Sequence, residues 1–125
     1  MRVLIIDDEL SIRAMTAVAL ETMGHQTAAA EDADAALRQL AAEHFDAAFL
    51  DLRLADQNGL ELLPRLLQSQ PGLGVIIFSG SATPADTTAA RNAGAAGFME
   101  KPFTPDQVRQ ALVNLPHAHV AAPVE

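Results

Sequence analysis

Four short apolar runs in this chain each stop abruptly at a polar or charged residue. The runs span residues 3–6, 47–50, 73–78 and 96–99, and they are followed directly by Asp7, Asp51, Ser79 and Glu100. Continuous apolar segments of this length are typical of parallel strands that are buried on both faces. An acid at the end of a buried strand is costly unless a nearby group requires its charge. The residues that end these runs are therefore the first candidates for a functional site.

Segments with helical periodicity separate these runs. We expect helices within residues 10–23, 32–43, 60–67, 83–94 and 104–115, and a weaker strand at 25–29 on an edge of the sheet. Thr83 and Thr104 each precede a proline and stand three residues before an acid or a glutamine, a pattern typical of helix N-termini. Gly24 and Gly94 are typical helix stops. Pro64 lacks an N–H group, so the helix around it either starts late or is kinked.

Five strands that alternate with five helices predict an α/β fold, a doubly wound parallel sheet with helices on both faces. Parallel strands end along one edge of the sheet, and ligands bind at that edge near the switch in strand order. Asp7, Asp8, Asp51, Ser79 and Lys101 all stand at the ends of predicted strands, and together they come from four of them. We therefore expect these side chains to converge in one pocket.

Three of these residues predict a metal site. Two carboxylates about 4 Å apart interact by roughly 4 kcal/mol at an effective dielectric near 20. Asp7, Asp8 and Asp51 together are unstable unless they are protonated or bind a divalent cation. Oxygen ligands with room for water suit Mg²⁺, which also neutralises charge on a transferring phosphoryl group.

The other residues at this edge suit a phosphoryl group. Lys101 offers a point charge to one phosphate oxygen, and the Ser79 hydroxyl offers a donor to another. Gly80 has no side chain and leaves a path for the phosphoryl donor. The nucleophile is then Asp51, which would form an aspartyl phosphate.

Composition limits the alternatives. The 125 residues fit one domain, which we place at residues 1–115, with residues 116–125 as a linker or a disordered tail. The chain has 16 acidic residues against 8 Lys and Arg, for a net charge of -8, which argues against direct nucleic-acid binding by this domain. Cysteine is absent, which rules out a disulfide framework. The sequence offers neither a signal peptide nor a membrane span, so we expect a soluble cytoplasmic protein without membrane contact.

From residue 3 to about 115, the chain resembles the receiver (CheY-like) domain of two-component response regulators. The resemblance rests on the Asp7-Asp8 pair, Asp51 with Gly59 eight residues later, Ser79 before a small residue, Phe98, and Lys101-Pro102. It implies a flavodoxin-like sheet with strand order 2-1-3-4-5. It also implies that Asp8, Asp51 and the backbone carbonyl of Arg53 bind Mg²⁺ directly, and that Asp7 helps through water. The phosphoryl donor would be the phosphohistidine of a sensor histidine kinase.

The resemblance also implies a conformational switch. The phosphoryl group attracts the Ser79 hydroxyl, and Phe98 turns inward into the space that is vacated. The fourth helix, fifth strand and fifth helix would form the output face, and a homodimer would use it. The family analogy predicts a cis peptide bond between Lys101 and Pro102. Many receivers have proline where this chain has Ala55, threonine is more common than Ser79, and Phe98 lacks the hydroxyl of a tyrosine.

Several functions compete with a phosphoacceptor switch. An aspartate-nucleophile phosphatase of the haloacid-dehalogenase type needs a second acid two residues after the nucleophile, where this chain has Arg53. A flavin carrier needs a phosphate loop after the first strand and stacking aromatics, and Trp and Tyr are absent. A degenerate receiver would lack part of the acid, hydroxyl and lysine set. We therefore expect a chain that catalyses only its own phosphorylation and dephosphorylation.

Two outputs are compatible with the sequence. A stand-alone receiver would signal by docking to a partner protein. Alternatively, the chain is the N-terminal domain of an NtrC-type transcriptional regulator, with an output domain following residue 125. The linker-like segment at residues 116–125 favours the second.

Overall fold

The computed structural model of the chain describes residues 1–54 and 57–115. Its main sheet has five parallel strands in the order β2-β1-β3-β6-β7. In chain order they are β1 (Arg2–Ile6), β2 (Gln26–Ala30), β3 (Ala47–Asp51), β6 (Gly74–Ser79) and β7 (Gly97–Glu100). The predicted doubly wound fold and the order 2-1-3-4-5 are confirmed, with β6 and β7 as the fourth and fifth long strands. The weak second strand lies at an edge, as expected.

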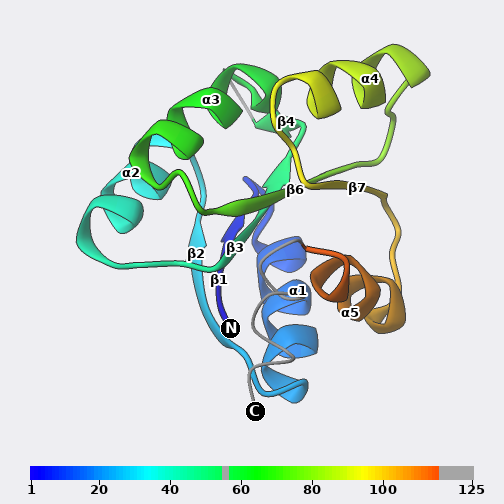
Figure 1. Cartoon of the computed structure of the whole chain (residues 1–125). Coiled ribbons are helices and arrows are strands. Elements are labelled where there is room, and N and C mark those ends of the chain that lie inside the picture. Colours follow the sequence, from blue (N-terminus) through cyan, green and yellow to red (C-terminus); the bar gives the residue numbers. More distant parts are fainter. Residues whose placement is uncertain (55–56, 116–125) are drawn as a thin grey trace.

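Helices cover both faces of this sheet (Figure 1). They are α1 (Leu10–Thr22), α2 (Ala33–Ala42), α3 (Gly59–Ser69), α4 (Pro84–Asn92) and α5 (Pro105–Val113). The buried apolar side chains of α1 and α5 belong to one core cluster, and those of α2, α3 and α4 belong to the other. Alternate residues of β1 supply the two clusters: Leu4 and Ile6 one, Val3 and Ile5 the other. A strand that is buried on both faces must be apolar throughout, which explains the unbroken run in the sequence.

The predicted helix starts are present. Thr83 and Asp86 form a complete capping box at the start of α4, and Thr104 and Gln107 form another at the start of α5. Gly24 follows α1 with a φ of +92°, a backbone conformation that favours glycine. The peptide bond between Lys101 and Pro102 is cis, as the family analogy predicted.

The connection after β3 differs from the prediction. A small antiparallel hairpin, β4 (Arg53–Leu54) and β5 (Gln57–Asn58), fills part of what looked like a plain loop. Helix α3 begins at Gly59 and continues through Pro64, so of the two alternatives that the proline left open, a late start is wrong. Its buried leucines Leu62, Leu63 and Leu66 anchor the helix on both sides of the proline.

Two remaining predictions concern the C-terminal segment and membrane-spanning helices. The segment at residues 116–125, predicted as a linker or tail, lies outside the described residues, and so does Ala55. Within the part of the chain that the structure describes, each helix is too short or too polar to cross a bilayer.

Candidate functional site

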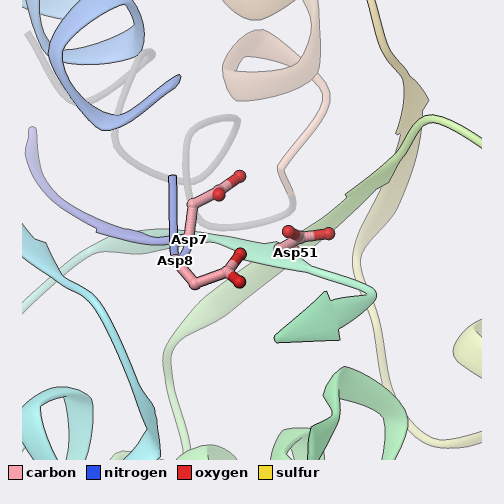
Figure 2. A group of neighbouring side chains, drawn as sticks. All are labelled: Asp7, Asp8 and Asp51. Carbon is pink, nitrogen blue, oxygen red and sulfur yellow. The ribbon is translucent and has the colours of Figure 1, made fainter. Parts of the chain in front are cut away.

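The carboxyl ends of β1 and β3 bring three acids together. Asp7, Asp8 and Asp51 each offer a carboxylate oxygen, and these oxygens lie within 4.8 Å of one another. Asp51 is the last residue of β3, while Asp7 and Asp8 follow β1, its neighbour in the sheet. Figure 2 shows the Asp8 side chain extending from the end of β1 toward Asp51. Asp7 is fully buried and Asp51 is 5% exposed, so bulk water does little to reduce their repulsion.

Lys101 is the cation that faces these acids. Its Nζ atom lies 2.8 Å from Asp7 Oδ2 and 3.4 Å from Asp51 Oδ2, and it also lies over the ring of Phe78, 4.7 Å from the centroid. Burial lowers the pKa of Lys101, but the hydrogen bond to Asp7 and the charges of Asp51 and Asp7 outweigh it, so the pKa is raised. The lysine therefore stays charged and partly neutralises the acidic pair.

Asp51 is held in place while its charge is only partly compensated. Burial raises the pKa of its carboxyl, and the neighbouring Asp7 adds to that effect. The backbone N–H of Arg53, which donates to Asp51 Oδ1 at 3.1 Å, and the Lys101 ammonium act in the opposite direction. The net shift is upward. A carboxylate in this condition gains from any additional cation that reaches it.

Ser79 ends β6 beside this group. It is 2% exposed, and the backbone N–H of Ser81 donates to its Oγ at 3.2 Å. Together with Asp51 and Lys101 it lines an open pocket of about 400 Å³. The other lining residues are Asp8, Glu9, Arg53, Gly80 and Ser81. The structure thus brings the predicted acids, hydroxyl and amine together, and Gly80 lies at the same opening.

The donor set fits a hard divalent cation. All three acids offer oxygen, the ligand atom that Mg²⁺ prefers. Both oxygens of Asp7 already have partners, since Oδ1 accepts from the backbone N–H of Glu9 at 2.8 Å and Oδ2 from Lys101. Asp8 is exposed. Asp8 and Asp51 also line the open pocket, whereas Asp7 is fully buried and held by Lys101 and the Glu9 N–H.

Phe98 lies away from this pocket. It is in β7, is half-buried and packs against the core cluster that α2, α3 and α4 share. It lines a groove of about 710 Å³ with residues of α4 and α5, and a small cavity of about 80 Å³ beside Thr87 and Ala90. Phe98 is therefore placed between the helix core and the α4–β7–α5 face.

Two contacts of the site were not found by sequence reasoning. One is the position of the Lys101 ammonium over Phe78, and the other is an ion pair between Arg53 and Asp86, whose Nη2 and Oδ2 atoms are 4.0 Å apart. Each contact joins segments that are distant in the sequence, so no local sequence pattern predicts it.

Comparisons with known proteins identify close relatives. The profile of the response regulator receiver domain matches residues 3–113. The alginate biosynthesis transcriptional regulatory protein AlgB of Pseudomonas aeruginosa is 36% identical over 110 residues, which are 88% of this chain and 24% of that protein. The nitrogen assimilation regulatory protein NtrX of Azorhizobium caulinodans is 38% identical over 108 residues, 85% of this chain and 24% of that protein. The chain thus spans about a quarter of these relatives.

Solved structures agree with this result. A response regulator receiver domain protein (CheY-like) from Methanospirillum hungatei superposes with a TM-score of 0.87 at 31% identity, covering 95% of this chain and 96% of the other. The receiver domain of NtrX from Brucella abortus superposes with a TM-score of 0.81 at 35% identity, covering 88% of this chain and 97% of the other.

Proposed function

The chain belongs to the response regulator receiver domain family of two-component systems, and from that premise we propose that Asp51 is the residue that accepts a phosphoryl group. One observation carries the proposal. The Asp51 carboxylate lies in a cluster with two further acids, and it lines one pocket with a buried hydroxyl and a charged amine. The residues that would bind a cation and those that would bind phosphate oxygens thus surround one nucleophile.

The proposed reaction is a direct transfer. An Asp51 carboxylate oxygen attacks the phosphorus of a phosphohistidine, a P–O bond forms, and the P–N bond breaks with its electron pair left on the imidazole nitrogen. Attack of water on the phosphorus later returns the carboxylate and releases inorganic phosphate. In this proposal the chain catalyses only its own phosphorylation and dephosphorylation and acts on no other substrate.

Each neighbour has a role in this proposal. The Lys101 ammonium moves from Asp51 Oδ2 to an oxygen of the phosphoryl group, and the Ser79 hydroxyl donates to another. Gly80 leaves the opening of the pocket free of a side chain. Asp8, Asp51 and the Arg53 carbonyl would hold Mg²⁺, with Asp7 acting through water. The ion would supply positive charge that offsets the charge of the transferring group.

A switch of the α4–β7–α5 face would carry the signal. Ser79 moves toward the phosphoryl group, and Phe98 turns further inward. Moving a two-state equilibrium from 1:99 to 99:1 takes about 5.5 kcal/mol. A few charge-assisted hydrogen bonds at roughly 1.5–3 kcal/mol each supply that amount. We propose this face as the output surface and as the contact of a homodimer.

Receiver domains of response regulators take their signal from sensor kinases and are attached to output domains. For this chain we propose a cytoplasmic receiver at residues 1–115, a linker at 116–125 and a transcriptional output domain beyond it. The support is that AlgB and NtrX, named as regulatory proteins, are about four times longer than the stretch that matches. The proposed donor is a sensor histidine kinase.

The test is phosphorylation with acetyl phosphate and Mg²⁺, followed by mass spectrometry of the intact protein and of its peptides. We expect one added phosphoryl group, located at Asp51 and absent from Asp51→Asn. Asp34→Asn is the matched control, because Asp34 is an exposed acid in the first turn of α2 and should leave labelling unchanged. Undiminished labelling of Asp51→Asn would show that the acceptor lies elsewhere.

A further inference from the structure

The Arg53 side chain connects the pocket with the start of α4. Arg53 stands two residues after Asp51, its backbone N–H donates to the Asp51 carboxylate, and it lines the opening of the pocket. Its guanidinium reaches the start of α4, where Nη2 lies 4.0 Å from Asp86 Oδ2. One residue thus touches the proposed phosphoacceptor through its backbone and α4 through its side chain.

The two partners of this ion pair differ in how firmly they are held. Asp86 is fixed by the capping box of α4, since its Oδ2 accepts from the Thr83 N–H at 3.0 Å and its own N–H donates to Thr83 Oγ1 at 3.1 Å. Its side chain is 23% exposed, whereas the Arg53 side chain is 63% exposed. Asp86 is therefore a fixed anchor, and Arg53 is the partner that is free to move.

The charge of the pocket gives Arg53 a second possible partner. Three carboxylates face one ammonium group there, so an anionic phosphoryl donor meets a pocket with excess negative charge until cations are added. Guanidinium binds phosphate oxygens in a planar two-point geometry that a single carboxylate oxygen at 4.0 Å does not satisfy. A phosphoryl group at Asp51 would therefore compete with Asp86 for this guanidinium.

We propose that Asp86 is a positioning residue that holds Arg53 away from the incoming phosphoryl group and so slows phosphorylation of Asp51. The inference rests on the proposed function, in which Asp51 is the acceptor. It assigns Arg53 to recognition of the phosphoryl donor and gives the capping acid of α4 a second role. Because competition is reciprocal, phosphorylation of Asp51 in turn loosens the contact between Arg53 and Asp86 of α4.

The experiment compares the wild type, Asp86→Asn, Arg53→Gln and the double variant. Asparagine keeps an oxygen for the Thr83 N–H, so the cap survives while the charge facing Arg53 is lost. Phosphorylation by acetyl phosphate is followed over a range of donor concentrations at low salt. We expect Asp86→Asn to increase the rate about two- to fivefold at low donor concentration, the range that exposed ion pairs support. The half-saturating concentration should fall, and high salt should reduce the effect.

In the Arg53→Gln background the same Asp86→Asn change should have no effect on the rate. An equal acceleration in both backgrounds, or none in either, would overturn the inference. Asp106→Asn removes one acid from the first turn of α5 and controls for net charge. It should not accelerate the reaction, and an acceleration equal to that of Asp86→Asn would also count against Arg53. If the wild type takes no phosphoryl group at Asp51, both the phosphoacceptor proposal and the role of Asp86 fail. If Asp51 is labelled at the same rate in the wild type and in Asp86→Asn, only the role of Asp86 is rejected.

Discussion

Replacing Gly59 with alanine should destabilise the fold because the backbone leaves no room for a side chain. A Cβ atom on Gly59 would lie 2.3 Å from the Asp51 carbonyl oxygen and 3.1 Å from both the Cα and the carbonyl oxygen of Leu52. The Gly59 N–H also donates to the Leu52 carbonyl at 2.6 Å, which holds the start of α3 against the end of β3. All three obstructing atoms belong to the backbone, so no rotamer change relieves the overlap.

The expected cost follows from this geometry. Overpacking in a well-packed region costs typically about 1–3 kcal/mol. Alanine recovers part of this through its higher helix propensity, by at most about 1 kcal/mol and by less at the first helical position. A 2.3 Å contact with a backbone atom lies in the upper part of the overpacking range, about 2–3 kcal/mol. After the propensity gain we therefore expect Gly59→Ala to lower the free energy of unfolding by about 1–3 kcal/mol. In a domain of this size the melting temperature should fall by at least about 3 °C.

Gly72→Ala is the matched control. A Cβ on Gly72 would meet no atom within 4 Å, and this residue is not in the left-handed region, so its unfolding free energy should stay within about 0.5 kcal/mol of the wild type. Urea unfolding of the three proteins measures both differences. Equal stabilities of Gly59→Ala and Gly72→Ala would refute the steric argument.

Three further predictions concern charges. Mg²⁺ should raise the melting temperature of the wild type more than that of Asp8→Ala, since a ligand of the native state stabilises it; Asp34→Ala is the control, and equal shifts in all three proteins would remove Asp8 from the metal site. Without Mg²⁺, burial raises the pKa of Asp51 in the folded state above its ordinary value of 3.8. The folded state therefore loses stability as the pH rises from 3.8 through that raised pKa. Asp51→Asn should therefore be more stable than the wild type at pH 7, and the difference should vanish in acid; a difference that persists below pH 3.8 would contradict this. Asp32→Ala, which removes the side-chain cap of α2, should cost about 1 kcal/mol in urea unfolding, and Asp34→Ala clearly less.

The sheet and the convergence of the site followed from the sequence because both depend on simple geometry. An apolar run without alternation, such as residues 3–6, can only be buried on both faces, and that requires helices on both sides of a parallel sheet. Once the strands are parallel, the residues that follow them share one edge. The sequence alone therefore predicts that Asp7, Asp51 and Ser79 lie together.

The parts that sequence reasoning missed depend on contacts between distant segments. Pro64 left a late start or a kink of α3 open, and the burial of Leu62 and Leu63 beside it outweighs the loss of one helical hydrogen bond, so the helix starts before the proline. The hairpin of β4 and β5 carries no apolar alternation that would reveal two-residue strands. The Arg53–Asp86 pair requires the hairpin and α4 to be placed first, so no local pattern in the sequence specifies it.

The proposed role of Asp51 also explains why the chain keeps a destabilising buried charge at this edge of the sheet. An asparagine at position 51 would avoid the burial of a charge beside Asp7, yet it would offer no carboxylate to a phosphorus atom. Lys101 offsets part of the repulsion but remains 3.4 Å from Asp51, within reach of a new partner. A cation that enters the pocket would therefore relieve this repulsion, whereas a phosphoryl group adds negative charge and needs Lys101 and the cation as partners. Each event can shift the structure, because a cation favours the arrangement with the least repulsion between the acids, and a phosphoryl group favours the one in which its oxygens reach Lys101 and Ser79.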